Sequence, residues 1–307
     1  MKKIKLYIPF IFVAIFLLSC NKKNNEQQTN NDSIGYHFND TIVKFGESPE
    51  IIAYRNFLHQ IDSTDATSLQ IAITKFKALF AGKATSTCDS SFIIYQNFVD
   101  TIESKLNEKL INDTTDYSAL FSGETAPDNI VKYQKTLNKN GFKISSSEGM
   151  AYIEQDRDLP VRELSHLLSA AMKEYLTEIA TENKEGFAED ASITISPQKY
   201  IDRLIWYEKF MAANPGFVMI ENCKNYKKAY LTYLITGIDN TPLFDDQDKF
   251  KLSAYHAKAY SYLANKYPDS ETLKAIKPYW NAIKQKQKEE IKKIKKDYIT
   301  KGLIYDL

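Results

Sequence analysis

The stretch SPQKYIDRLIWYEKFMAANPG, residues 196–216, carries the signals that decide the fold. Ser196 followed by Pro197 is typical of a helix start, because serine accepts a hydrogen bond from a free backbone N–H and proline has its φ angle fixed. Apolar residues then recur every three or four positions until Asn214-Pro215-Gly216 ends the pattern. The stretch therefore predicts an amphipathic helix. Its apolar positions are Ile201, Leu204, Tyr207 and Met211.

The same pattern recurs through the rest of the C-terminal third. Residues 230–235 predict a helix that ends at Gly237. Asp248 predicts the start of the next helix, and Ser270 that of the last and longest. Helix-ending prolines that follow large apolar residues resemble the hairpins of tetratricopeptide repeats. However, Pro215 and Pro268 are 53 residues apart, whereas those repeats recur at about 34. We therefore expect stacked helical hairpins without assigning that family.

Helical periodicity also runs through the N-terminal part. It predicts helices over 48–61, 65–81 and 89–110, which we expect to pack as an antiparallel bundle. Residues 112–127 are rich in Thr, Ser, Asp and Gly and predict a long loop or a boundary.

The middle of the chain gives a mixed pattern. A short helix is expected to end at Asn140-Gly141, and residues 142–144 to be briefly extended. Ser145 and Glu148 have capping-box spacing and predict a helix that is interrupted around Pro160. The fold class predicted is all-α, a helical bundle or stacked helical hairpins, with about eight helices and little or no sheet.

The N-terminal sequence has the pattern that is typical of a secretion signal. Three lysines among the first five residues precede an apolar run over 6–18, which is too short to span a bilayer comfortably. Leu17-Leu18-Ser19-Cys20 resembles the lipobox of bacterial lipoproteins. The resemblance implies that Cys20 becomes the lipidated first residue of the mature chain, with palmitate-like acyl chains as a membrane anchor. A plain signal peptide cleaved near a cysteine is the alternative.

The residues after Cys20 suggest where the anchor lies. Residues 21–33 are polar and without aliphatic side chains, which predicts a tether. Lipoproteins of Bacteroidetes-like bacteria often reach the cell surface through an acidic cluster beside the lipidated cysteine, whereas Lys22 and Lys23 stand here. We therefore expect an outer-membrane protein that faces the periplasm. Loss of the three leader lysines changes the formal charge from +1 to −2, which does not indicate nucleic-acid binding.

Four regions follow from these patterns. Residues 1–19 are predicted as a lipoprotein signal peptide, 20–46 as a flexible tether, 47–111 as an N-terminal helical part and 112–307 as a C-terminal helical part. Alternatively, the two helical parts form one continuous domain.

The cysteines and histidines give little indication of a reactive or metal-binding site. An oxidising envelope permits a disulfide between Cys88 and Cys223, and two separately buried thiols are the alternative. The four histidines lack zinc-site spacing, so we predict neither a metal nor a cofactor. They are His37, His59, His166 and His256.

Familiar hydrolase, nucleotide-binding and dehydrogenase motifs are missing from the sequence. The densest acidic groups lie at 154–158 and 245–248. Glu154 and Asp158 would share a helix face, and paired carboxylates can act as acid and base in glycoside cleavage. A solvated face and an acid-rich helix N-terminus are the alternative interpretations. The six acids are Glu154, Asp156, Asp158, Asp245, Asp246 and Asp248.

Aromatic and basic residues gather toward the C-terminus. Trp and Tyr can stack on sugars or anchor proteins. Seven lysines between 284 and 296 suggest attraction to anionic lipid or peptidoglycan, but an apolar stripe in the same helix indicates that they form its wet side. The residues predicted for a binding surface are Tyr200, Trp206, Tyr207, Tyr279 and Trp280.

These patterns predict a lipid-anchored envelope protein that works by binding, as a scaffold or capture module. Its partners would be the membrane, through the anchor, and an envelope protein or glycan, but not nucleic acid. The alternative is an enzyme acting on envelope glycans or other polymers, with acids near Glu154 or Asp245.

Overall fold

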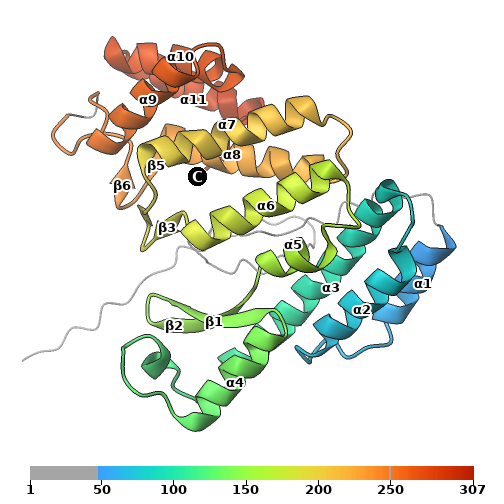
Figure 1. Ribbon diagram of the computed structural model, residues 1–307. Coiled ribbons are helices and arrows are strands. Elements are labelled where there is room, and N and C mark those ends of the chain that lie inside the picture. The colour runs from blue at the N-terminus through green and yellow to red at the C-terminus, as the bar shows by residue number, and fades with distance from the viewer. Residues whose placement is uncertain (1–47, 249) are drawn as a thin grey trace, which may run out of the picture. The chain divides into compact units, whose positions relative to one another are not determined.

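The computed structural model describes residues 48–307 except 249, and this part of the chain is predominantly helical (Figure 1). It contains eleven α-helices, one short 3₁₀ helix and three two-stranded antiparallel hairpins. The helical fold class is therefore confirmed, while the predicted number of about eight helices is too low. The signal peptide, the lipidated Cys20 and the tether predicted over 1–46 lie outside the described residues.

The elements follow one another along the chain as labelled in Figure 1. The helices are α1 (Pro49–Leu58), α2 (Ser68–Phe80), α3 (Thr85–Ile111), η1 (Ser118–Leu120), α4 (Asp128–Lys139), α5 (Asp158–Leu164), α6 (Ala170–Glu185), α7 (Pro197–Ala213), α8 (Ile220–Thr236), α9 (Ala254–Lys266), α10 (Glu271–Lys284) and α11 (Lys288–Thr300). The strands are β1 (Phe142–Ser147), β2 (Met150–Gln155), β3 (Ala188–Glu189), β4 (Ser192–Ile193), β5 (Gly237–Ile238) and β6 (Thr241–Pro242).

Helices α1, α2 and α3 pack against one another around aromatic side chains. The Tyr54 ring meets those of Phe76 and Phe80 edge-on, with centroid distances of 5.4 and 5.6 Å. This arrangement places the positive edge of one ring against the negative face of the next. The Tyr54 hydroxyl donates to the Ala72 carbonyl at 3.2 Å, which satisfies its polar end inside the core. The packing of the first three helices is thus as predicted, although α3 begins at Thr85 rather than Asp89.

The helix predicted from Ser145 is wrong, because strands β1 and β2 form an antiparallel hairpin there. Glu148 and Gly149 make the turn with φ angles of 50° and 79°. Two successive left-handed residues match the twist of a tight hairpin, and glycine adopts that conformation without steric cost. The Ser145–Glu148 spacing fits a capping box, but these residues belong to the end of β1 and its turn.

Asn107 fixes this hairpin on α3. Its side-chain amide donates to the Ile153 carbonyl at 2.7 Å, and its side-chain oxygen accepts from the Ile153 N–H at 2.8 Å. The asparagine therefore satisfies both backbone groups of a strand residue, as a neighbouring strand would. The buried Ile144 and Ile153 side chains occupy the same face of the hairpin, paired across it.

Helix α7 is central to the C-terminal part and contacts α8, α9 and α10 (Figure 1). Its predicted start is confirmed, because the Ser196 hydroxyl accepts from the Lys199 N–H at 3.2 Å. The predicted start of α9 at Asp248 is wrong. Ser253 caps that helix, while the Asp248 carboxylate accepts from the Phe250 N–H at 2.9 Å in the preceding loop.

The last helix was predicted as one long element, but it is two. Helix α10 ends at Lys284, α11 begins at Lys288, and Lys286 between them has a φ of 55°. A residue in the left-handed region ends a helix because the hydrogen-bond ladder cannot continue through it. The two helices pack on each other, with the Tyr279 and Tyr298 rings 6.4 Å apart.

Glu208 of α7 holds the start of α10. Its carboxylate accepts from the N–H groups of Glu271 and Thr272 at 2.9 and 2.8 Å. The Thr272 hydroxyl donates to it at 2.6 Å. Burial opposes ionisation of Glu208, but these hydrogen bonds outweigh it and keep its pKa below the usual range. A carboxylate at a helix N-terminus also interacts favourably with the helix dipole.

We predict that Glu208→Ala lowers the free energy of unfolding by about 2 kcal/mol, because two helix N–H groups and a hydroxyl lose a charged acceptor. The measurement is urea unfolding at neutral pH, followed by circular dichroism. Glu221→Ala is the control, since this exposed residue forms an ion pair with Lys224 within the first turn of α8, and we expect a change under about 0.5 kcal/mol. Equal effects of the two substitutions would contradict the assignment.

Candidate functional site

Three of the five aromatic residues predicted for a binding surface are core residues. Tyr200 and Tyr207 are 0% exposed and Tyr279 is 2% exposed. Their hydroxyls bond inside the protein: Tyr200 donates to the Tyr230 carbonyl at 2.5 Å and Tyr279 to the Ile235 carbonyl at 3.2 Å. The prediction of a surface formed by these three tyrosines is therefore wrong. A buried tyrosine with a hydroxyl partner packs as well as phenylalanine does.

The two tryptophans of that predicted surface are half-buried and lie on different helices. Trp206 of α7 stacks on Phe210, with ring centroids 4.8 Å apart. Trp280 of α10 lies beside Tyr260 and carries the Lys284 ammonium over its ring at 4.6 Å. Each tryptophan is thus packed against its own neighbours.

Cys88 and Cys223 are both free and buried. The predicted disulfide between them is absent, and the alternative of two separately buried thiols holds. Burial raises the pKa of Cys223 to about 12, so its thiol stays protonated and unreactive at neutral pH.

The acids at 154–158 do not share a helix face, because Glu154 lies on β2 and Asp158 begins α5. Glu154 accepts a hydrogen bond from Ser145 and forms an ion pair with Lys143 at 3.0 Å. Asp158 pairs with Lys184 at 2.5 Å. Asp156 accepts from Arg162 at 2.7 Å. These carboxylates connect neighbouring elements and are not arranged as an acid and base pair.

The acids at 245–248 stabilise a loop and not a helix N-terminus. The Asp245 carboxylate accepts from the Gln247 N–H at 3.0 Å. Hydrogen bonds from Gln247 and Phe250, respectively, hold the pKa values of Asp245 and Asp248 below their usual range. A general acid needs the opposite shift, so these residues are poor candidates for glycoside cleavage.

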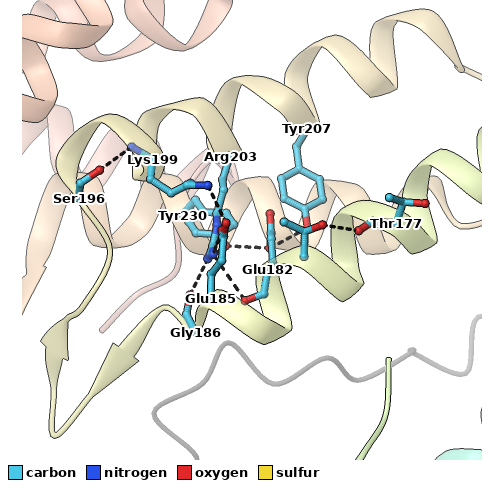
Figure 2. Close-up of polar contacts among 10 residues, drawn as sticks. Thr177, Glu182, Glu185, Gly186, Ser196, Lys199, Arg203, Tyr207 and Tyr230 are labelled. Atoms are coloured by element: carbon cyan, nitrogen blue, oxygen red, sulfur yellow. Dashed lines mark hydrogen bonds and ion pairs between the residues drawn. The ribbon is translucent and has the colours of Figure 1, made fainter. Parts of the chain in front are cut away.

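The most unusual group of ionisable side chains lies where α6, α7 and α8 meet (Figure 2). Glu182 of α6 is 1% exposed and Arg203 of α7 is 2% exposed. The Glu182 carboxylate accepts from the hydroxyls of Tyr230 at 2.9 Å and Tyr207 at 3.2 Å. We call Glu182, Arg203, Tyr207 and Tyr230 the buried network. Fully buried charged side chains are rare unless they are paired.

The Arg203 guanidinium bonds to several acceptors at once. It donates to the Gly186 carbonyl and to a Glu185 carboxylate oxygen, each at 2.8 Å, and to the Tyr230 hydroxyl at 3.3 Å. Lys199 also pairs with Glu185, at 2.6 Å (Figure 2). Glu185, which is partly exposed, forms an ion pair with Arg203 and thereby balances its charge.

Burial raises the pKa of Glu182 to about 7, and the attraction of Arg203 and the hydrogen bonds from Tyr230 and Tyr207 offset only part of that effect. An ordinary glutamate titrates near 4.3. Glu182 therefore changes its charge close to neutral pH.

A second carboxyl of this kind lies on α3. Burial raises the pKa of Glu103 to about 7. The Gln155 side-chain amide of β2 donates to Glu103 at 2.5 Å and to Asp100 at 2.6 Å, and Gln96 donates to Asp100 at 2.8 Å. This polar cluster joins the β1–β2 hairpin to α3.

Sequence reasoning missed both carboxyls, although a signal existed. Gln96, Asp100, Glu103 and Asn107 recur every three or four residues beside the apolar stripe of α3. Glu178, Glu182 and Glu185 do the same on α6. Polar residues at helical spacing are usually solvated, but the packing of other elements buries Gln96 and Glu182 and partly covers Glu103.

The buried network can hold a proton at neutral pH, but its contacts are with its own chain. A general acid must reach its substrate directly or through one water, and Glu182 is covered. A surface groove lies elsewhere, on α1 and α2, lined by Phe57, Gln70, Ile71, Thr74, Lys75 and Ala78. The network therefore joins α6, α7 and α8 through polar contacts inside the protein.

Within residues 48–248 and 250–307, no helix is long and apolar enough to cross a membrane. The same residues contain no group of three His, Cys, Asp or Glu side chains placed to hold a metal ion. Comparison with known proteins gives no match, whether to a family model, a curated protein or a solved structure.

We predict that Glu182→Gln removes part of the pH dependence of stability. The pKa of Glu182 is higher in the folded chain than in the unfolded chain, so the folded state holds an extra proton between about pH 4.5 and 7. Wild-type stability from this group is therefore greatest below that window and falls as pH rises through it. Relative to wild type, the variant should gain about 2–3 kcal/mol between pH 5 and pH 8. Chemical denaturation at both pH values measures this.

The control for that experiment is Glu174→Gln, an exposed residue on the same helix. It should change stability equally at both pH values. If the difference between Glu182→Gln and wild type were also the same at pH 5 and pH 8, Glu182 would not titrate in this window.

We also predict that Arg203→Ala lowers the free energy of unfolding by about 3–5 kcal/mol, because it leaves buried acceptors and a carboxylate without their cation. Lys199→Ala is the matched control, since it removes only a partly exposed ion pair to the same Glu185, and should cost under about 1 kcal/mol. Thermal or urea unfolding compares the two. A small effect at Arg203 would mean that the buried network contributes little to stability.

Proposed function

We propose that this chain is a lipid-anchored protein of the bacterial cell envelope, held at the outer membrane facing the periplasm, and that its helical part binds another envelope component. The observation that carries the proposal is the tetrapeptide Leu17-Leu18-Ser19-Cys20 after a basic and apolar leader. Cys20 then bears the acyl chains. Buried methylenes contribute roughly 0.8 kcal/mol each, so two or more chains hold a protein firmly on a bilayer.

The distance between the anchor and the first helix supports a capture or scaffold role. About 30 residues, largely polar at first, separate Cys20 from Pro49. If these residues form the flexible tether that the sequence predicts, their root-mean-square end-to-end distance would be about 30 Å. A helical body on such a tether can search the space next to the membrane for a partner.

The contacts of the acidic residues support binding over catalysis. Glu154, Asp158 and Asp245 each bond to residues of the same chain in loops, turns and ion pairs. Glu182, one of two carboxyls whose pKa is raised to about 7, is 1% exposed and lies inside the buried network. These acids stabilise the fold, which leaves the exposed surface as the part of the molecule that meets a ligand. The ligand would be an envelope protein or a glycan.

The anchor is tested by expressing the full chain and its Cys20→Ala variant in a bacterial host. In the wild type, mass spectrometry should find an N-terminal peptide that begins at Cys20 and carries acyl chains, and the protein should fractionate with membranes. The variant should remain unprocessed and unacylated. Cys88→Ala is the control and should behave as wild type, because Cys88 is buried. A wild-type protein that is cleaved, unmodified and free in the periplasm would favour the plain signal peptide.

Binding is tested by crosslinking the lipidated protein in its own envelope, recovering it and identifying both bound proteins and released glycans by mass spectrometry. A reproducible partner supports the proposal. Turnover of an envelope glycan by the purified protein would instead support the enzyme. If Glu154→Gln and Asp245→Asn then abolished turnover without unfolding the chain, the acids predicted from sequence would be catalytic after all.

A further inference from the structure

The C-terminal segment 284–301 differs in charge from the rest of the chain. It contains eight lysines and three acids, a formal charge of +5, while the whole chain has +1. The remaining residues therefore sum to −4. A local excess of this size, opposed in sign by the rest of the protein, is an electrostatic feature that can select an anionic partner.

Most of these lysines belong to α11, where they gather on one side. At about 100° per residue, Lys288, Lys292, Lys295 and Lys296 fall within an arc of about 100°. Glu290 and Asp297 lie on the opposite side of the helix by the same geometry. We call the four lysines the basic face.

The basic face is not the side that packs on the protein. Ile291, Ile294 and Tyr298 of α11 contact the hydrophobic core, and the Tyr298 hydroxyl donates to the Ala275 carbonyl of α10. Lys288, Lys292 and Lys296 are exposed. The helix is thus held by its apolar stripe, while three lysines of the basic face point to solvent and the fourth, Lys295, is half-buried.

Of the four lysines of the basic face, one forms an ion pair within the described part of the chain. Lys292 pairs with Glu289 at 3.1 Å, and both side chains are more than half exposed. Among residues 48–248 and 250–307, Lys288, Lys295 and Lys296 have no ion pair. Exposed ion pairs are weak, so Lys292 also remains available to an external anion.

We propose that the basic face of α11 contacts the anionic lipid headgroups of a bilayer. A lysine at such a surface contributes roughly a fivefold gain in partitioning, so three of them give about a hundredfold. The contact would turn the helical body toward the membrane in one orientation. It goes beyond the proposed lipid anchor and does not require Cys20 to be acylated.

The experiment uses the whole chain that remains after residues 1–19 are removed, carrying Cys20→Ser so that no lipid is attached. This protein is sedimented with vesicles of phosphatidylcholine, with and without phosphatidylglycerol, at low and high salt. We expect binding only to vesicles that contain phosphatidylglycerol, and loss of binding at high salt, because salt screens surface charges. Lysine-to-glutamine changes at 288, 295 and 296 together should weaken it at least tenfold.

The matched control changes Lys132, Lys135 and Lys139 of α4 to glutamine. These exposed lysines are also without ion pairs among the described residues, and the net charge falls by the same three units. We expect less than a twofold effect, and melting curves should show that both triple variants are folded. Equal weakening in the two variants, or no binding to anionic vesicles at low salt, would overturn the proposal.

Sedimentation with purified peptidoglycan completes the test. Binding to peptidoglycan in place of vesicles would also overturn the lipid proposal. Acylation of Cys20 is measured separately on the full chain, so failure of one proposal is distinguishable from failure of the other.

Discussion

A guanidinium that is 2% exposed needs partners, because a buried charge without them costs several kcal/mol. Arg203 meets this constraint with groups from both neighbouring helices: the Gly186 carbonyl and Glu185 carboxylate at the end of α6, and the Tyr230 hydroxyl on α8. The C-terminal carbonyls of a helix lack intrahelical partners and carry partial negative charge. A cation from α7 placed there fixes how α6 ends and where the β3–β4 hairpin begins. One side chain of α7 thus links the end of α6, the residue before the β3–β4 hairpin and α8.

Buried tyrosine hydroxyls elsewhere in the chain also need hydrogen-bond partners, and they find them in backbone carbonyls. Tyr54 donates to the Ala72 carbonyl, Tyr260 to that of Leu234 and Tyr279 to that of Ile235. A carbonyl oxygen can accept a second hydrogen bond without leaving its helix. Each tyrosine therefore brings a large ring into the core and ties its own helix to a neighbouring one. This use explains why an aromatic-rich C-terminal third is mainly core and only marginally surface.

Local signals predicted the helices well where one residue decides the boundary. Ser196-Pro197 and the Asn140-Gly141 stop lie where the structure has a cap and a helix end. The prediction failed where the deciding partner is distant in sequence. The Ser145–Glu148 spacing fits a helix cap, but pairing of β1 with β2 and the support of Asn107 on α3 select the hairpin. Similarly, no residue near Lys286 marks the break between α10 and α11 in the sequence. The break allows the two helices to pack on each other.

The two carboxyls with raised pKa values, Glu182 and Glu103, could not be predicted from the sequence for a related reason. Glu182 and Glu103 sit in helical stripes of polar residues that the sequence alone presents as solvated, and their raised pKa values arise only when other elements cover them. The fold itself thus absorbs the two carboxyls best able to hold a proton at neutral pH. Glu182 is hydrogen-bonded to Tyr207 and Tyr230, and Glu103 to Gln155.

Charge is unevenly distributed along the chain, with a formal charge of +5 in segment 284–301, which includes α11, and −4 in the remaining residues. Charge on an exposed helix needs no enclosed site in order to act, since it attracts an extended anionic surface directly. A bilayer is such a surface, and the leader sequence independently predicts that this protein is held beside one. The two features lie at opposite ends of the chain and would act through different physics, the predicted anchor through burial of acyl chains and the proposed contact through screened electrostatics. A body bound at both ends would have its orientation set, whereas a tether alone would leave it free to turn.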